Sequence, residues 1–271
     1  MSLVVNTNIG SLNAQRSLAS SSNELQTAME RLSSGKKINS AADDAAGFAI
    51  AERMTAQVRG LNMATKNAND GLSMLAVIEN ATNDVTDMLQ RMRELAVQAA
   101  NDTNSATDRG YLQKEADALL AEINRVASQT QYNGQTVLDG SYQNKAIQVG
   151  TDAGQTVSFS VAGIDTGALG LSSNIDLVNN ASSALASISS AIEQVSGQRA
   201  EYGALQNRLE YTVSNLMNVS EFTTAARSRI EHADFAAESA RLAKAQVLQQ
   251  TGTAMLAQAN ASSQLAISLI R

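Results

Sequence analysis

The side chains that could carry out chemistry are few and scattered along the chain. The 271 residues include no cysteine and one histidine, His232. A thiolate nucleophile, a disulfide and a histidine- or cysteine-rich metal cluster are therefore excluded. His232 lies beside Glu231 and Asp234, where an imidazole could respond to pH, but an isolated surface histidine usually has no role and we assign it none.

Three carboxylates, Asp43, Asp44 and Glu52, lie close together in the sequence and could bind a cation or act as paired acids. No nucleophile–base pair accompanies them, and carboxylates near a helix start are stabilised by the helix dipole. The nearby SSGKK sequence lacks the GxxxxGK[ST] spacing of a phosphate-binding loop. We therefore predict no catalytic residues, no metal site, no cofactor and no enzyme.

The composition favours long helices that pack on one another. The chain has no proline, is rich in alanine, and has only 3% aromatic residues, and an interior proline would cost a helix about 3 kcal/mol. The net charge is −6 with scattered basic residues, which argues against a nucleic-acid partner. No run of 18 apolar residues occurs, and the N-terminus lacks the basic and apolar regions of a signal peptide, so we expect no membrane partner.

Apolar spacing predicts the helices that would have to position any site. Heptad spacing begins at Ala14 and continues to Leu32, followed by a linker at 33–41 with Ser40 as a possible helix cap. A second helix over 44–101 would be about 85 Å long, and a third, over 112–130, would fold back on it. The positions expected to form the seam of the second helix are Leu61, Ala64, Ala68, Leu72, Leu75, Ile78, Thr82, Val85, Leu89, Met92, Ala96 and Ala99.

Residues 132–175 change character and predict a small β region. Asn133-Gly134 and Asp139-Gly140 are turn dipeptides, and Val157, Phe159 and Val161 alternate with polar residues. Another long helix follows, to about Ala233. The predicted fold is mainly α, a long antiparallel coiled-coil or helical bundle with a small β-hairpin region in the middle.

Both ends of the chain are poor in charge. Residues 2–23 contain only Arg16, and residues 245–270 contain no charged residue, which is typical of helices surrounded by protein. Tails that order only on assembly would explain the same pattern. Such ends could build an open filament or a closed coiled-coil oligomer. The expected subunit-packing residues are Leu18, Leu25, Leu32, Leu248, Met255, Ala259, Ala266 and Leu269.

Several segments resemble bacterial flagellin. They include RLSSGKKINSAADDAAGFAIAERM at 31–54, QRMRELAVQAAN at 90–101, QTQYNGQTVLDG at 129–140, GALQNRLEYTVSN at 203–215 and the long stretch at 229–260. Both termini also match the flagellin pattern, and only about 45 β-type residues lie where many flagellins carry outer domains. The resemblance is to a minimal flagellin without large outer domains.

The resemblance implies a subunit that self-assembles into the helical flagellar filament for swimming motility. It implies residues 1–40 with 236–271 as a terminal coiled-coil domain that lines the filament channel, and 41–235 as a helical rod domain. It also implies type III export to the cell exterior, an export chaperone on the C-terminal segment, and contact with the filament cap and hook-associated junction proteins.

The resemblance further implies recognition by the Toll-like flagellin receptor through Arg91, Glu94, Leu95 and Glu115. From spacing alone, Arg91 and Glu94 would be an ordinary i,i+3 ion pair on a helix face. Three alternatives for the chain as a whole stay open: a hook-filament junction protein of the same superfamily, an exported coiled-coil oligomer, and an enzyme housed in the middle region.

Overall fold

The computed structural model describes residues 7–172 and 175–268, with side chains to residue 262. The chain divides into two compact units, residues 1–56 with 222–271 and residues 57–221. We call them the terminal unit and the central unit. The domain boundaries predicted from the sequence, at 40/41 and 235/236, differ from these unit boundaries and stay a prediction.

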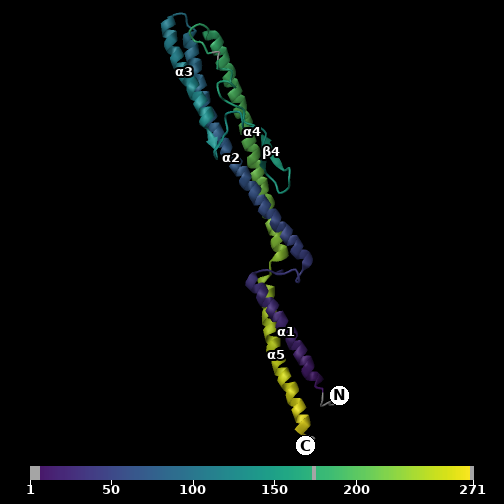
Figure 1. Ribbon diagram of the computed structural model, residues 1–271. Helices are drawn as coiled ribbons and strands as arrows, with labels where there is room; N and C mark the ends of the chain where they lie inside the picture. Colours follow the sequence, from purple (N-terminus) through teal and green to yellow (C-terminus); the bar gives the residue numbers. More distant parts are fainter. Residues whose placement is uncertain (1–6, 173–174, 269–271) are drawn as a thin grey trace. The chain divides into compact units, whose positions relative to one another are not determined.

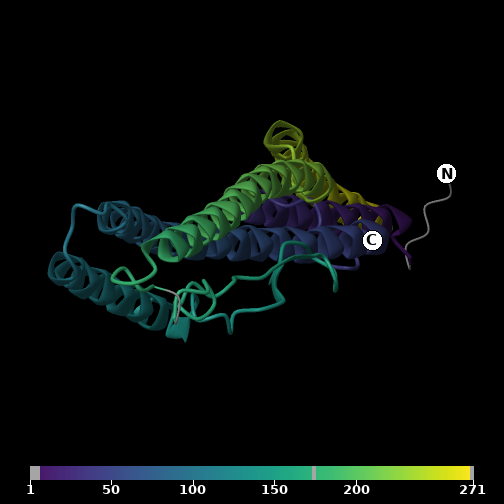
Figure 2. The ribbon, with the colours of Figure 1, turned by 90° about the horizontal axis from the view of Figure 1, so that it is seen from above.

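Five helices carry the described chain. They are α1 (Ile9–Ser34), α2 (Ala45–Ala99), α3 (Ala106–Gln129), α4 (Ala181–Glu231) and α5 (Phe235–Ser268). Figures 1 and 2 show α2, α3 and α4 running side by side through the central unit, with the segment between α3 and α4 laid along them. The mainly helical fold class and the long antiparallel helices predicted from the sequence are confirmed.

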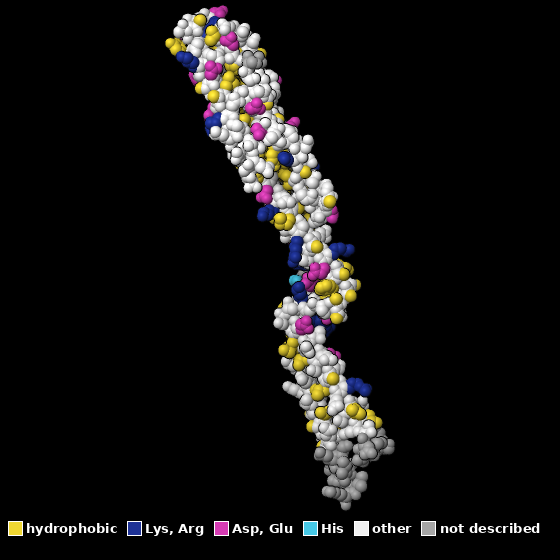
Figure 3. All heavy atoms as spheres, in the orientation of Figure 1, with side chains coloured by type: hydrophobic (Ala, Val, Ile, Leu, Met, Phe, Trp, Pro, Cys, Tyr) yellow, Lys and Arg dark blue, Asp and Glu magenta, His cyan; other side chains and the backbone are white. Residues whose placement is uncertain are grey.

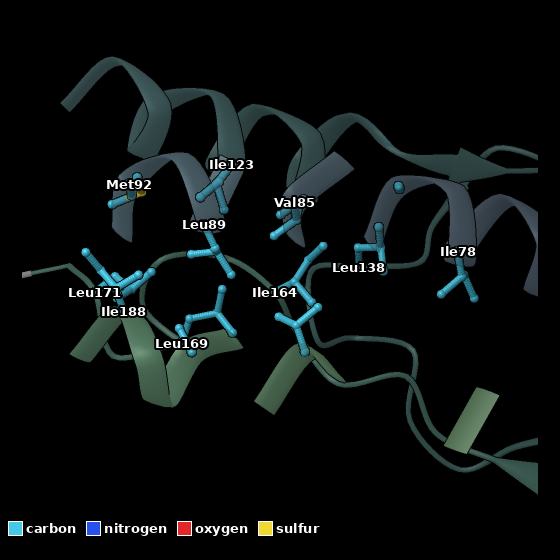
Figure 4. Close-up of a cluster of buried hydrophobic side chains, with 14 of the residues drawn as sticks. Ile78, Val85, Leu89, Met92, Ile123, Leu138, Ile164, Leu169, Leu171 and Ile188 are labelled. Atoms are coloured by element: carbon cyan, nitrogen blue, oxygen red, sulfur yellow. The ribbon is translucent and has the colours of Figure 1, made fainter. Parts of the chain in front are cut away.

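The core of the central unit is a seam between these three helices. Of the twelve seam positions predicted in α2, all except Leu72 are buried, and Leu72 packs partly buried against the same core. Figure 4 shows Leu89 and Met92 of α2 in one cluster with Ile123 of α3 and Ile188 of α4. Leu138, Ile164, Leu169 and Leu171 complete this core from the segment between α3 and α4.

Two small antiparallel strand pairs make up the β region. β1 (Gln131–Tyr132) pairs with β2 (Gln135–Thr136), and β3 (Lys145–Gln148) pairs with β4 (Thr156–Phe159). The Asn133-Gly134 turn predicted from the sequence joins the first pair, and both residues have positive φ, 49° and 76°. Val157 and Val161 are buried and Phe159 packs against the core, so the predicted apolar face is confirmed.

The expected cap of the second helix is wrong. α2 starts at Ala45, and the backbone N–H of Gly47 donates to Oδ1 of Asp44 at 2.9 Å, so Asp44 caps the helix. Ser40 instead donates its backbone N–H and its hydroxyl to Asp43 Oδ2. These hydrogen bonds hold the pKa of Asp43 below its ordinary value, with the backbone N–H groups of Ser40 and Asn39 as the main causes. The carboxylates therefore order the linker and the helix start.

Candidate assembly surfaces

In the terminal unit, α1 and α5 pair along a close seam. The α1 positions Ala14, Leu18, Ser21, Leu25, Ala28 and Leu32 are all partly or fully buried, as the heptad spacing predicted. Asn8 caps α1 and donates its side-chain N–H to the carbonyl of Ala259 at 2.8 Å. A Cβ on Gly252 would lie 3.3 Å from Cδ1 of Leu18. The small residue at 252 therefore lets the two helices approach closely.

The phase of the expected seam on α5 needs correction. The positions that α1 covers, at least in part, are Glu238, Leu242, Ala245, Gln249, Gly252, Leu256 and Ala259. The sequence spacing predicts a seam through Leu248, Gly252, Met255 and Ala259, of which only Gly252 and Ala259 belong to this set. The spacing alone leaves the phase open, because α5 has no charged residue from Ala245 onward to mark an exposed face.

The residues that lie off this seam present an apolar outer surface on the terminal unit. On α5, Val247, Leu248 and Met255 are 58%, 40% and 64% exposed, and on α1 Ile9 and Leu12 are 62% and 53% exposed. Figure 3 shows this pair of helices with mostly white and yellow side chains away from the linker. Lys244 and Arg16 are the charged residues within one turn of these side chains. Exposed apolar side chains with so little charge around them are typical of a surface that another protein covers.

The residues predicted to pack between subunits fall into two groups. Leu18, Leu25, Leu32 and Ala259 lie on the internal α1–α5 seam, whereas Leu248 and Met255 face solvent. The side chain of Ala266 and the whole of Leu269 lie outside the described part of the chain. Contacts between subunits stay a prediction for all eight residues.

An exposed ion-pair cluster joins α2 to α3 in the central unit. The Arg91 guanidinium lies 2.8 Å from the Glu94 carboxylate and 2.9 Å from that of Glu115. The predicted i,i+3 pair is therefore present, and Glu115 adds a contact between helices. Hydrogen bonds to Glu94 and then Glu115 raise the pKa of Arg91, so its positive charge is present at every physiological pH.

Leu95 differs from its three neighbours in the predicted receptor site. Its side chain is 1% exposed and belongs to the core of the central unit. The heptad seam could have shown this, because Leu95 lies next to the seam residue Ala96 and three positions after Met92. In this conformation the chain offers Arg91, Glu94 and Glu115 to a partner, but not the Leu95 side chain.

A buried charge that the sequence did not reveal lies where α1 meets α5. Glu238 is 5% exposed, with the guanidinium of Arg241 at 3.3 Å and that of Arg31 at 4.0 Å. These side chains line a hollow of about 480 Å³ together with polar residues of α1. A buried carboxylate needs such cations nearby. Arg241 is three residues from Glu238 on α5, whereas Arg31 comes from α1, so no local pattern signals the second partner or the burial.

The remaining candidate features from the sequence, His232 and the acidic side chains, form no functional site among the described residues. His232 forms an isolated backbone bridge with Lys36, and its ring Nδ1 lies 3.1 Å from the Ser228 hydroxyl. Among the described residues, no group of three or more histidine, aspartate or glutamate side chains could hold a metal ion. None of the described helices has an apolar stretch long enough to cross a membrane.

Comparison with known proteins decides the family. Residues 5–143 match the family model of the bacterial flagellin N-terminal helical region, and residues 185–270 match that of the C-terminal helical region. The chain belongs to the bacterial flagellin family. It is 42% identical to a flagellin of Halalkalibacterium halodurans over 272 residues, covering 99% of this chain and 100% of that one.

Two further relatives agree with this flagellin assignment. The flagellar filament 33 kDa core protein of Treponema phagedenis is 41% identical over 286 residues, covering 99% of this chain and all of the relative. The crystal structure of Bacillus cereus flagellin matches with a TM-score of 0.51 and 32% identity, over 56% of this chain and 88% of that one.

A putative flagellar hook-associated protein of Vibrio parahaemolyticus matches with a TM-score of 0.59 over 70% of this chain and 100% of that chain. Its identity of 14% shows a shared fold and no more. The resemblance to flagellin seen in the sequence is confirmed, and with it the function: the chain is a structural subunit that self-polymerises into the flagellar filament.

Proposed function

We propose that this flagellin polymerises through the outward-facing apolar side chains of α1 and α5. The observation that carries the proposal is the exposure of Val247, Leu248 and Met255 on a stretch of α5 without charge. Burying one such side chain contributes about 1.5–3 kcal/mol. Because every subunit in a filament repeats the same contact, small gains per residue accumulate into a stable polymer.

The test places a charge on the outer face while leaving the α1–α5 seam intact. Leu248→Asp should abolish filaments seen by electron microscopy after addition of a precipitant, with an unchanged circular dichroism spectrum. Leu248→Met, which conserves volume and apolarity, is the matched control and should polymerise. Normal filaments from Leu248→Asp would show that this face is not buried in the polymer.

Ala259→Asp tests the inner seam. Ala259 lies on α5 next to Gly10, where a Cβ on the glycine would be 3.8 Å from the alanine side chain. A carboxylate there would separate α1 from α5 and should also abolish filaments, but with loss of helical signal from the terminal unit. The two variants therefore distinguish failure of a subunit contact from failure of the subunit itself.

The finer partners and the location of the chain follow from family membership as proposals. We infer export through the flagellar type III apparatus and assembly outside the cell beneath the filament cap, with hook-associated junction proteins at the filament base. The charge-free part of α5 is the segment we expect the export chaperone to cover, because it is apolar and would otherwise associate too early. Pull-down of purified chaperone with and without residues 236–271 tests this.

Recognition by the Toll-like flagellin receptor is a second proposal, carried by the exposed cluster of Arg91, Glu94 and Glu115. Their side chains are 51%, 68% and 45% exposed. Arg91→Ala should weaken activation of receptor-bearing cells by the folded monomer. Arg125→Ala is the control, because Arg125 is also 51% exposed and pairs with Glu122. Equal activation by both variants would contradict the proposal.

A further inference from the structure

Methionine is the one sulfur-containing residue type in this chain, since the sequence holds nine methionines and no cysteine. The described methionines differ strongly in exposure. Met29, Met63, Met217 and Met255 are 56%, 56%, 58% and 64% exposed, whereas Met74 and Met92 are 4% and 0% exposed. Oxidants that attack sulfur therefore have a small set of accessible targets, all of them thioethers.

Met255 has surroundings that the other three exposed methionines lack. It lies on α5 within a stretch, residues 245–270, that contains no charged residue. Val247 and Leu248, two turns before it, are also exposed apolar side chains. Met29, by contrast, is followed directly by Glu30 and Arg31, and Met63 and Met217 belong to the central unit.

We propose that Met255 is an oxidation site at which peroxides block assembly of the free subunit. This inference rests on the proposed use of the outer face of α5 in polymerisation. In the reaction, a hydroperoxide transfers one oxygen atom to the methionine sulfur. The O–O bond breaks, the thioether is oxidised to a sulfoxide, and the peroxide is reduced to water or to an alcohol.

The sulfoxide opposes assembly for a physical reason. It converts an apolar side chain into a polar one with a strong hydrogen-bond acceptor, and burying such a group without a donor is costly. Glutamine and asparagine side chains occur along α5, but the contact surface formed by Val247, Leu248 and Met255 has no side-chain N–H of its own. Polymerisation in turn covers Met255, so the filament protects the residue that the free subunit exposes.

The experiment oxidises the free, full-length chain with limiting hydrogen peroxide, so that each molecule carries few sulfoxides. Polymerisation is then induced with a precipitant, and filaments are separated from free chains by sedimentation. Peptide mass spectrometry measures the sulfoxide at each methionine in both fractions. We expect Met255 sulfoxide to be enriched about tenfold or more in the free fraction, the effect of losing one buried methionine per contact.

The same mass spectra provide two controls, the buried methionines and preformed filaments. Met92 and Met74 should stay unoxidised, because they are buried. Treatment of preformed filaments should leave Met255 largely unoxidised. Equal Met255 sulfoxide in filament and free fractions, or equal reactivity of Met255 in filaments and in free chains, would overturn the proposal.

A variant and an enzymatic reversal make the assignment specific. Peroxide should reduce polymerisation of Met255→Leu, relative to its own untreated sample, much less than it reduces polymerisation of the natural chain. Methionine sulfoxide reductases of both stereospecificities should restore polymerisation of the oxidised natural chain. Equal peroxide sensitivity of the variant and the natural chain would assign the effect to another methionine and contradict the proposal.

The experiments distinguish an error in the proposed assembly surface from an error in the proposed oxidation site. If the outer face of α5 is not used, Leu248→Asp polymerises normally and Met255 reacts equally in filaments and in free chains. If the face is used but the sulfoxide is tolerated, Leu248→Asp fails to polymerise while chains with Met255 sulfoxide enter filaments freely. The first result rejects the assembly surface, and the second rejects the oxidation site alone.

Discussion

Gly71 of α2 lies so close beneath Ile147 of β3 that a Cβ on the glycine would overlap Cδ1 of the isoleucine. Eleven residues earlier on the same helix, a Cβ on Gly60 would lie 2.8 Å from Cγ2 of Thr151. Between these points the Asn67 side chain donates to the carbonyl of Gln148 at 3.1 Å. The β3–β4 hairpin is therefore held against one face of α2 by two close approaches and one hydrogen bond.

Gly71→Ala should destabilise the central unit by roughly 1 kcal/mol net. The added methyl group overpacks the contact with Ile147, at about 1–3 kcal/mol, and alanine inside a helix offsets about 0.5–1 kcal/mol of that cost. Urea unfolding measures the change in free energy. Gly110→Ala in α3 is the matched control: nothing lies within 4 Å of its Cβ position, so it should stabilise the chain by about 0.5–1 kcal/mol. Ile147→Val, which removes the Cδ1 methyl, should offset part of the loss in the double variant.

Gln113 anchors the segment before α4 to α3. Its Nε2 donates to the carbonyl of Ile175 at 3.0 Å, and its Oε1 accepts from the backbone N–H of Leu177 at 2.7 Å. Gln113→Ala leaves both backbone groups without these partners and should cost about 1–3 kcal/mol. Gln129→Ala, at the exposed end of α3, should change the unfolding free energy much less. Faster hydrogen exchange at Leu177 in the first variant alone would locate the effect.

The carboxylate of Asp108 should make the stability of the folded chain depend on pH, and the direction of this dependence follows from its pKa. The hydroxyl and backbone N–H of Ser105 both donate to its carboxylate, and they lower its pKa from 3.8. Its contribution to stability is therefore present above 3.8 and is lost as the pH falls further, through the folded-state pKa.

Comparison with Asp108→Asn measures this contribution. The variant should melt at a lower temperature than the natural chain at about pH 7, and the two Tm values should converge as the pH is lowered toward about 2. Asp102→Asn is the control, because Asp102 is also exposed but lies outside the capping box, the reciprocal hydrogen bonds between Ser105 and Asp108 at the start of α3. A Tm difference for Asp108→Asn that stays constant with pH would contradict the capping role.

Variants of Leu95 and Arg91 should distinguish a side chain that stabilises the core from one that only presents charge at the surface. Leu95→Ala opens a cavity in the core and should cost about 2–5 kcal/mol in urea unfolding. Arg91→Ala removes an exposed ion pair and should leave the unfolding midpoint nearly unchanged. A large loss of stability in the Arg91 variant would show that the cluster with Glu115 holds α3 to α2.

The helical frame was predictable because its signals are local or periodic. Heptad spacing located the buried side of α2, and Asn133-Gly134 located a hairpin turn, since both depend on residues near one another in sequence. The sequence predicts Ser40 as the cap of α2 and the structure has Asp44, because both residue types are good caps and backbone geometry chooses between them. The resemblance to flagellin predicts Leu95 in an exposed receptor site, whereas its place beside the heptad seam puts the side chain in the core, where it is 1% exposed.

The sequence by itself determined that this chain forms long, proline-free helices with charge-poor ends. Tertiary structure decided which side of α5 faces α1, because from Ala245 onward this helix has only apolar, small and uncharged polar residues, whose pattern leaves its rotation open. It alone paired Glu238 with Arg31, and brought Ile147 onto Gly71, since these partners are distant in the chain. Periodicity fixes the structure of a helix, but contacts between distant residues fix its orientation, and that orientation leaves Met255 exposed.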